Sequence, residues 1–411
     1  MLSQAHNAAA IAGADTSSSK RVPFPIANLT LEHVSADSFG ELCDLVEMQA
    51  VEHKTTIKGK RTDFFKAVMS DDPTEKILTG IILRNKATQD AVGYILTSKF
   101  HSPDGDGIYL EDFMMVPEMQ NRGLGTFSFD ILREIAEEED CAIIACTVDA
   151  SKGNSRRFYE RIGMRQNPMP LLSMGSYRMA NTDNGAIVVM DQDDMSKVQS
   201  SSRMTVSAKD IAAQDLRHVS IADAAIDPSS VRLLKEADIE HLAQKDFSSA
   251  VHNPELAIAS MRKCHNSPLG FGIVEIDKAG VPTAVMMAST TYSTFNNCAR
   301  TNVGPAFSVD GQAVSTARLL NMVAFAQRRT HAERLEVQMQ PTAWSQHGTS
   351  DLVEMCVSLM TEHADSQETP YSIRVADMAE SRVTPEMRAA LRPQIKPQVV
   401  AAAAANDLIV K

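Results

Sequence analysis

The residues from Gln120 to Gly125 have the types and spacing of an anion-binding loop. They read Gln-Asn-Arg-Gly-Leu-Gly, follow an apolar run from Ile108 to Val116, and lead into a helical pattern from Gly123 to Glu138. Glycine lets the backbone approach a ligand closely, and the unpaired N–H groups at a helix N-terminus favour an anion. The loop lacks the Lys-Ser/Thr pair of a nucleotide-triphosphate loop, and no GxGxxG dinucleotide fingerprint is present. We therefore expect a pyrophosphate group of another kind here.

The elements around this loop predict one α/β unit. Hydrophobic periodicity predicts strands over 29–34, 76–83, 91–97, 108–116 and 142–148, and helices over 38–49, 62–69, 123–138 and 157–164. The loop therefore joins a central strand to the helix that follows it.

Two motifs in this unit resemble the GNAT superfamily of N-acetyltransferases. Gln120-x-x-Gly123-x-Gly125 matches the coenzyme A pyrophosphate loop of that family. The strand before it begins Tyr-Leu-Glu-Asp-Phe from Tyr109 to Phe113, which is similar to the corresponding strand of diamine (spermidine/spermine) acetyltransferases.

Two later segments extend the resemblance, which runs from Leu31 to Met179. The apolar run 142–148 follows the helix at the family's spacing, and 157–164, Arg-Phe-Tyr-Glu-Arg-Ile-Gly-Met, is similar to the family's closing helix. The resemblance implies an N-acetyltransferase that uses acetyl-CoA as cosubstrate and a primary amine as acceptor. Small amines, polyamine-like compounds and protein lysines all remain open.

The resemblance also implies which residues contact the coenzyme. Main-chain groups of the loop would hold the pyrophosphate, with Arg122 adding charge, and N–H groups near Met115 and Val116 would polarise the thioester. Lys152 stands where the family usually has asparagine, with Asn154 displaced from that position. The full set of expected contacts is Phe113, Met114, Met115, Val116, Gln120, Asn121, Arg122, Gly123, Leu124, Gly125, Thr126, Lys152 and Asn154.

Acetyl transfer to an amine requires the neutral amine. A lysine-like amine has a pKa of about 10.4, so about one molecule in 2,500 is neutral at pH 7, a cost of about 4.6 kcal/mol. A carboxylate that removes the proton offsets that cost. Glu111 is the candidate base, and strand alternation predicts that it shares a face with Phe113, opposite Leu110 and Asp112. The alternative is that Glu111 only lies in the cleft and orders water.

The family's tyrosine in Phe-Tyr-x-Arg corresponds to Tyr159, which the resemblance assigns as the acid that protonates the departing thiolate. Asp112, Glu52 and His53 are candidates for contacting the substrate, although Asp112 could instead pair structurally. The segment 52–61 carries four positive charges where diamine acetyltransferases have acidic residues. These charges disfavour a polycation, unless the loop is merely solvated outside the cleft.

The second half of the chain repeats the same order of elements, so we infer a tandem duplication. Strands are predicted over 218–221, 271–276, 283–290, 302–309 and 334–340, with helices within 228–244 and over 312–329 and 350–360. Where the first copy has its loop, the second reads Val-Asp-Gly-Gln-Ala from Val309 to Ala313, with one glycine and an acid that would repel pyrophosphate. We expect a degenerate copy that serves as an intramolecular pseudo-dimer partner.

The expected fold class is α/β (α+β), with two tandem GNAT-type domains, each a mixed and mostly antiparallel sheet flanked by helices. The expected segments are a disordered N-terminal tail (1–27), a catalytic domain (28–182), a linker (183–214), a degenerate GNAT-like domain (215–377) and a C-terminal tail (378–411).

Composition narrows the function classes. The 411 residues carry a net charge of −12, which argues against nucleic-acid and anionic-membrane partners and suits cationic substrates. The six cysteines form no CxxC motif, and no histidine cluster has metal-ligand spacing, so we expect reduced thiols, a cytoplasmic location and no metal. The Ala- and Ser-rich start leaves open a secreted bacterial effector that acetylates a host protein. A non-catalytic scaffold is the alternative from another class.

Overall fold

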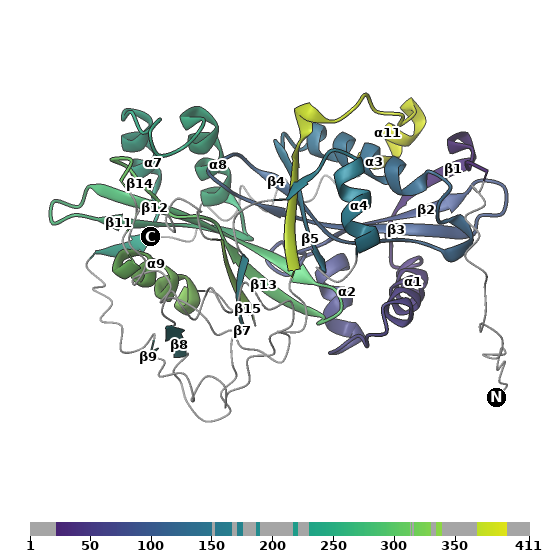
Figure 1. Ribbon diagram of the computed structural model, residues 1–411, viewed down its shortest axis with the longest axis horizontal. Helices are drawn as coiled ribbons and strands as arrows, with labels where there is room; N and C mark the ends of the chain where they lie inside the picture. The colour runs from purple at the N-terminus through teal and green to yellow at the C-terminus, as the bar shows by residue number, and fades with distance from the viewer. Residues whose placement is uncertain are drawn as a thin grey trace.

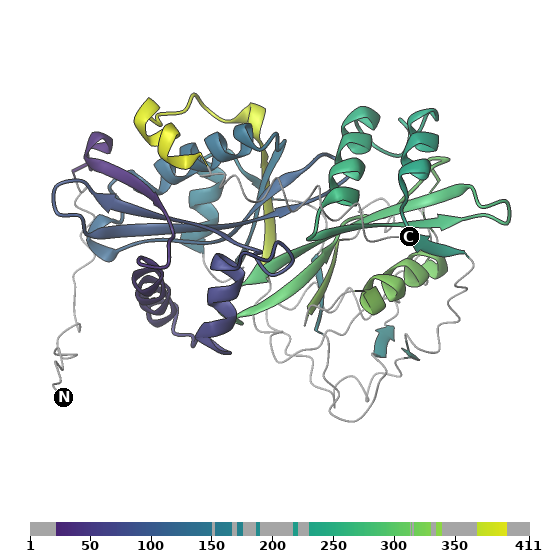
Figure 2. The same ribbon diagram turned by 180° about the vertical axis from the view of Figure 1, so that it is seen from behind.

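The computed structural model describes residues 22–149, 153–166, 171–175, 186–189, 217–220, 230–312, 314, 316–329, 334–338 and 368–392. These residues form two units that lie side by side, each a mixed sheet flanked by helices (Figures 1 and 2). This confirms the mixed α/β fold class. Lys152, the predicted helix over 350–360, the first 21 residues and most of the predicted linker lie outside the described residues.

The first sheet has the strand order β1-β2-β3-β4-β5-β16-β6, and only the β4–β5 pair is parallel. Its strands are β1 (Leu29–His33), β2 (Thr79–Asn85), β3 (Ala91–Phe100), β4 (Gly107–Met115), β5 (Ile143–Asp149), β16 (Glu368–Arg374) and β6 (Arg165–Gln166).

Helices cover both faces of this sheet. The core on one face includes α1 (Phe39–Glu52) and α2 (Arg61–Met69), and the core on the other includes α3 (Leu124–Glu138), α4 (Gly153–Arg161) and α11 (Pro385–Leu391). Short 3-10 turns lie at Ile26–Asn28, Pro117–Met119 and Val375–Asp377.

The second sheet repeats this topology with the order β10-β11-β12-β13-β15-β7, and again only one pair, β13–β15, is parallel. Its strands are β10 (Val231–Leu233), β11 (Gly270–Ile276), β12 (Pro282–Ser293), β13 (Cys298–Val303), β15 (Arg334–Gln338) and β7 (Leu171–Gly175), with β14 (Phe307–Ser308) beside β12. The helices are α7 (Glu236–Ala243), α8 (Pro254–Asn266) and α9 (Thr316–Arg329). The shared topology agrees with the duplication inferred from the sequence.

One predicted strand of the second half has a different place. The segment expected at 218–221 is β9 (Arg217–Ser220), which pairs with β8 (Ala186–Val189) in a separate two-stranded sheet. The first strand of the second sheet is β10 instead, and α8 was not predicted.

The two units exchange a strand. β7, from the first half of the chain, pairs with β15 in the second sheet, while β16, from near the C-terminus, pairs with β5 and β6 in the first. Neither sheet is therefore built from a continuous segment, and the expected domains 28–182 and 215–377 each give a strand to the other. A strand edge presents backbone groups that any extended segment can pair with, so side-chain pattern alone does not reveal the partner.

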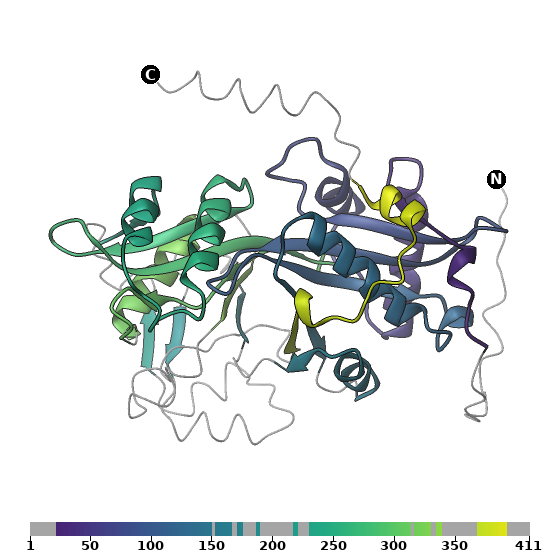
Figure 3. The ribbon, with the colours of Figure 1, turned by 90° about the horizontal axis from the view of Figure 1, so that it is seen from above.

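The segment after β16 is not a free tail as far as residue 392. It crosses α3 and ends in α11, as the yellow segment in Figure 3 shows. Three carboxylates spaced four residues apart on α3 meet three arginines of this segment, in the pairs Asp130–Arg382, Glu134–Arg388 and Glu138–Arg392. Residues four apart share one helix face, so the acids form a continuous docking row. The expectation of a tail from 378 was wrong for this part.

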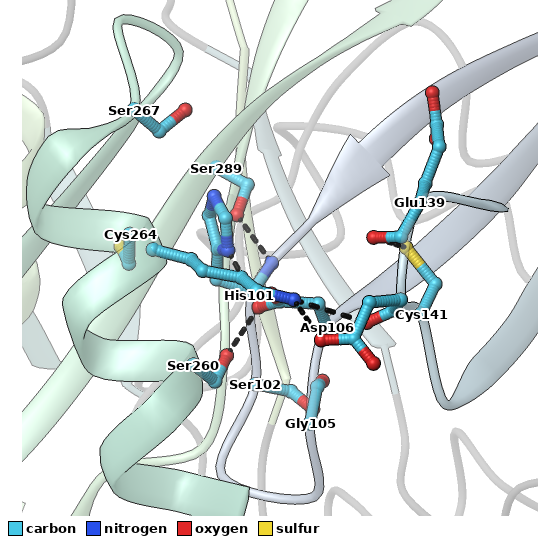
Figure 4. Close-up of polar contacts among 12 residues, drawn as sticks. His101, Ser102, Gly105, Asp106, Glu139, Cys141, Ser260, Cys264, Ser267 and Ser289 are labelled. Carbon is cyan, nitrogen blue, oxygen red and sulfur yellow. Dashed lines mark hydrogen bonds and ion pairs between the residues drawn. The ribbon is translucent and has the colours of Figure 1, made fainter. Parts of the chain in front are cut away.

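A polar cluster joins the loop between β3 and β4 to the second unit (Figure 4). His101 Nδ1 lies 2.7 Å from Asp106 Oδ1, and Ser260 Oγ of α8 donates to the same oxygen at 2.5 Å. Lys263 Nζ lies 3.3 Å from the other Asp106 oxygen, and the His101 N–H donates to Ser289 Oγ of β12 at 2.8 Å. The cluster therefore fixes the two units to one another through a buried carboxylate.

The contribution of Asp106 to stability is expected to depend on pH. Burial acts to raise the pKa of Asp106, but the hydrogen bonds from His101 and Ser260 and the charges of His101 and Lys263 outweigh it and lower the pKa. A lowered carboxyl pKa stabilises the fold above the unfolded value of about 3.9, and this stability is lost as pH falls through the folded value. Asp106→Asn should lower the free energy of unfolding by about 1–3 kcal/mol at pH 7, with a smaller difference below pH 4.

Urea denaturation of both proteins from pH 3 to 7 measures this difference. Asp104→Asn, in the same loop but half exposed, is the matched control and should change little. An Asp106→Asn deficit that stayed constant with pH would contradict the electrostatic explanation.

No helix in the described ranges has the length and apolar character that crossing a membrane would require.

Candidate active site

A cavity of about 630 Å³ lies where the C-terminal turn of α1, the end of β4, the loop 120–126 and α4 meet. Its lining residues are Gln49, Glu52, His53, Phe113, Met114, Met115, Gln120, Asn121, Gly123, Gly125, Thr126, Asn154, Ser155, Arg157, Phe158, Tyr159 and Arg161. Twelve residues singled out from the sequence thus border one space, whereas Glu111, Asp112, Val116, Arg122 and Leu124 do not line it.

The loop has the geometry of an open anion site. Gly123 precedes α3 with φ of 89°, in the left-handed region that favours glycine, and a Cβ built on it would have no atom within 4 Å. A Cβ at Gly125 would lie 3.3 Å from the Phe158 ring, so this glycine allows α4 to approach α3 closely. Phe127 N–H donates to the Gly123 carbonyl, and the N–H groups of the three residues before it have no carbonyl partner within the helix.

The glycine in the corresponding loop of the second unit, Gly311, has no open space beside it. A Cβ on Gly311 would lie 2.1 Å from Ser249 Oγ, and Asp310 Oδ1 accepts hydrogen bonds from the Gln312 N–H and from Ser308 Oγ. The loop of the second unit is therefore closed by its own side chains and lacks the open glycine that directly precedes α3.

Three expected coenzyme contacts also make other interactions in this structure. Arg122 donates to the Val22 carbonyl at 3.0 Å and lies over the Phe24 ring. The Leu124 side chain lies in the core, so its expected contact is through the main-chain N–H. The Val116 N–H donates to the carbonyl of Val92 on β3 at 3.0 Å, so this N–H already has a hydrogen-bond acceptor.

The Met115 N–H is better placed than the Val116 N–H to contact the coenzyme thioester. Successive N–H groups of a strand point to opposite edges, so the Met115 N–H points away from β3. On that side the pairing of β4 with β5 extends only over Gly107 to Tyr109. The two strands therefore separate before Met115, which leaves its N–H facing the gap between them.

Tyr159 lies at the cavity wall within a cluster of aromatic rings. Its ring packs against Phe129 and Phe158 and is stacked on Tyr371 of β16, with centroids 6.0 Å apart. Burial, followed by the nearby Cys146 and Asp112, raises the pKa of Tyr159 well above 10. The hydroxyl is therefore protonated at neutral pH. Tyr371 was missed because its strand is more than 200 residues away in sequence.

Glu111 lies between the units and not at the cavity. Its side chain is 1% exposed and pairs with Arg300 of β13 at 2.5 Å. Its other oxygen accepts from Ser98 Oγ at 2.5 Å and from the Tyr292 N–H at 3.0 Å. The carboxylate is thus surrounded by donors that stabilise its charged form.

The predicted face of Glu111 was wrong because β4 contains a bulge. Leu96 pairs with Asp112 and Thr97 pairs with Leu110, so the backbone register between β3 and β4 skips Glu111. A bulge interrupts the alternation of side chains. Phe113 therefore packs against the α3 core, whereas Glu111 meets Tyr292, which belongs to the core under α1 and α2.

Asp112 belongs to a buried hydrogen-bond network on the α1 side of the sheet. Its oxygens accept from Gln49 Nε2 at 2.7 Å and from the Tyr94 hydroxyl at 2.8 Å, and all three side chains are buried. This network anchors α1 to β3 and β4.

Glu52 and His53 border the cavity at the end of α1. Gln120 Nε2 donates to Glu52 Oε1 at 3.3 Å, and the His53 ring lies 5.7 Å from the ring of Phe295 of the second unit. The basic loop that follows is held by the same turn, since the Lys58 N–H donates to the Phe295 carbonyl at 2.8 Å.

Several lining residues were not predicted. Ser155, Phe158 and Arg161 of α4 share the cavity wall with Asn154 and Tyr159. Positions three and four residues apart lie on one helix face. Ser155 is four residues before Tyr159, Phe158 is four residues after Asn154, and Arg161 is three residues after Phe158, so helical spacing from Asn154 and Tyr159 could have indicated them. Gln49 gave no comparable signal.

Residues 45–164 match the Acetyltransferase (GNAT) family. The matched segment contains the loop, the strand β4, and Tyr159. The chain therefore carries an N-acetyltransferase domain of this family, and acetyl-CoA is the acetyl donor of the family. No curated protein matches the chain.

Solved structures with similar folds have low identity. A tandem GNAT protein from the clavulanic acid biosynthesis pathway is 12% identical, with a TM-score of 0.37, over 84% of this chain and 98% of that one. A GCN5-related N-acetyltransferase from Sphaerobacter thermophilus is 10% identical, with a TM-score of 0.38, over 85% and 96%. Spermidine N-acetyltransferase from Vibrio cholerae is 10% identical, with a TM-score of 0.28, over 35% and 84%.

Proposed function

We propose that the first unit transfers the acetyl group of acetyl-CoA to a primary amine in the 630 Å³ cavity. The observation that carries this proposal is that the open glycine loop at the start of α3 and the protonated Tyr159 border the same space. A bound coenzyme thioester needs an anion site for its pyrophosphate and a proton donor for its departing thiolate.

In this proposal the donor is held by backbone groups. The N–H groups of Leu124, Gly125 and Thr126 bind the pyrophosphate at the helix N-terminus. The Met115 N–H polarises the thioester carbonyl in the gap between β4 and β5. Tyr159, whose hydroxyl is protonated at neutral pH, then donates a proton to the departing thiolate.

We assign removal of the amine proton to His53 in place of Glu111. His53 borders the cavity, and histidine is the side chain whose charge changes near neutral pH. Glu52, beside it, would attract the ammonium form of the acceptor. Glu111 is engaged by Arg300, Ser98 and the Tyr292 N–H, so its role is to join the units.

The acceptor in this proposal is a primary amine. None of the four basic side chains in the loop after His53 (Lys54, Lys58, Lys60 and Arg61) lines the cavity, and Arg61 borders a separate pocket. Small amines, polyamine-like compounds and protein lysines are therefore all candidate acceptors, and a screen of the three classes for coenzyme A release separates them.

Thr126→Glu is the decisive variant for the donor site. Thr126 lies in the first turn of α3 and borders the cavity, where a carboxylate would repel pyrophosphate. An acid in a first turn is compatible with the helix dipole, so the fold should persist. Calorimetry should show acetyl-CoA affinity reduced about 100-fold or more, because opposing like charges costs several kcal/mol.

Thr126→Gln is the matched control, with similar size and no charge, and should bind within about fivefold of the parent. Parent protein that failed to bind acetyl-CoA would favour a non-catalytic scaffold. Equal binding by parent and Thr126→Glu would place the coenzyme elsewhere.

A further inference from the structure

Arg122, in the middle of the glycine loop, is held by the segment 22–24, which we call the clasp. Arg122 Nε donates to the Val22 carbonyl at 3.0 Å, and the Arg122 carbonyl accepts from the Phe24 N–H at 3.1 Å. The guanidinium also lies over the Phe24 ring, 5.2 Å from the ring centroid. Both the main chain and the side chain of Arg122 therefore contact a segment 100 residues away in the sequence.

The clasp is itself anchored in the first unit. Phe24 is 9% exposed and belongs to the core on the α3 side of the sheet, together with Leu124 and Phe127. Pro23 and Pro25 flank it, and proline fixes the backbone angle φ, so the segment has little freedom to move away. The clasp is therefore a rigid support for the loop.

The backbone of the loop requires such a support. Arg122 lies between two residues with positive φ, Asn121 at 60° and Gly123 at 89°. A non-glycine residue keeps this left-handed conformation only where the surrounding structure imposes it. Asn121 and Gly123 line the coenzyme cavity, whereas Arg122 and Phe24 do not. The clasp can therefore act on the cavity only through the backbone of the loop.

We propose that Phe24 is a positioning residue for the coenzyme site. By holding Arg122, it keeps the loop 120–126 in the conformation that presents the N–H groups at the start of α3 to a pyrophosphate. Arg122 serves in this arrangement as the anchor of the loop and not as a charge that contacts the pyrophosphate. A binding site that is already ordered loses less conformational entropy when its ligand binds, so the clasp raises affinity without taking part in the chemistry. The identity of the ligand rests on the proposed function, but the effect on the loop does not.

Hydrogen exchange over residues 119–127 measures the effect on the loop directly, without any coenzyme. The N–H groups of Met119, Gln120 and Phe127 are hydrogen-bonded, so their exchange reports opening of the loop. In the full chain, Phe24→Ala should speed this exchange about tenfold or more. Phe24→Leu keeps an apolar side chain in the core and should give an intermediate rate, which also serves if the alanine variant does not fold.

Phe247→Ala is the matched control. Phe247 is a fully buried phenylalanine of the second unit, so its truncation also leaves a cavity in a core. It should leave exchange over 119–127 unchanged. Equal acceleration by Phe24→Ala and Phe247→Ala, or no acceleration by Phe24→Ala, would overturn the proposal.

Calorimetry and steady-state rates test the consequence for the coenzyme. Phe24→Ala should weaken acetyl-CoA binding about tenfold and leave kcat at saturation within about twofold of the parent, as expected for a residue that acts on binding alone. Arg122→Lys and Arg122→Met should both weaken binding about tenfold, because lysine keeps the charge but has neither the Nε donor nor the planar group that stacks on a ring.

Near-parent binding by Arg122→Lys together with a loss in Arg122→Met would overturn the proposal, since it would assign Arg122 a direct charge contact with the pyrophosphate. Parent protein that bound no acetyl-CoA would contradict the proposed function instead. Hydrogen exchange in Phe24→Ala would then still decide whether the clasp holds the loop.

Discussion

Replacing Tyr159 by phenylalanine should lower kcat by about 10²- to 10⁴-fold, the range for loss of a general acid. The ring and its packing against Phe129, Phe158 and Tyr371 would remain, so acetyl-CoA affinity should change little. The parent enzyme should show no loss of activity from Tyr159 ionisation below pH 10, because its pKa lies above that value. Steady-state rates of coenzyme A release and calorimetry measure the two quantities.

Tyr109→Phe is the matched control for this prediction. The Tyr109 hydroxyl donates to Thr147 Oγ1 at 3.0 Å in the same sheet and does not border the cavity. Its loss should leave kcat within about threefold of the parent. Comparable losses in both variants would mean that Tyr159 acts through packing and not as an acid.

The largest effect on stability is expected from Arg300→Met. Arg300 is 5% exposed on its side chain, pairs with Glu111, donates to Thr291 Oγ1 at 2.9 Å and lies over the Tyr109 ring. Methionine would keep much of the volume but leave the Glu111 carboxylate buried without its counterion. Breaking a buried pair in this way costs about 3–5 kcal/mol, measurable as a lower midpoint in urea denaturation followed by circular dichroism.

The double variant Glu111→Gln/Arg300→Met tests the cause, since removing the buried charge should recover part of the loss. Lys66→Met, which breaks the exposed Lys66–Glu75 pair, should leave the midpoint unchanged within error. A single-variant loss that the double variant does not relieve would assign the effect to Arg300 packing alone.

The Tyr159–Tyr371 contact connects the exchanged strand β16 to the wall of the candidate active site. Tyr371 lies on β16, is fully buried, and accepts a hydrogen bond from Arg156 Nε at 3.2 Å. The last strand of the second half therefore supports the wall that carries the candidate acid. Together with the Glu111–Arg300 pair, this contact shows that residues from the second half of the chain pack against the first sheet.

The sequence by itself determined the local features of this protein. The glycine loop 120–126 and the helix after it were predicted close to their observed positions, as were the strands of the first sheet apart from β6 and β16. The helix carrying Tyr159 was predicted over 157–164 and spans Gly153–Arg161. Hydrophobic periodicity and glycine spacing record the conformation of neighbouring residues, so features built within one strand-turn-helix can be inferred from them.

Only the tertiary structure decided which residues from distant parts of the chain contact these local features. The bulge at Glu111 turned its side chain towards Arg300 of the second unit, and β16 brought Tyr371 beneath Tyr159. A strand edge or a carboxylate is satisfied by any suitable partner, and the choice depends on the packing of the whole chain, which local pattern does not encode.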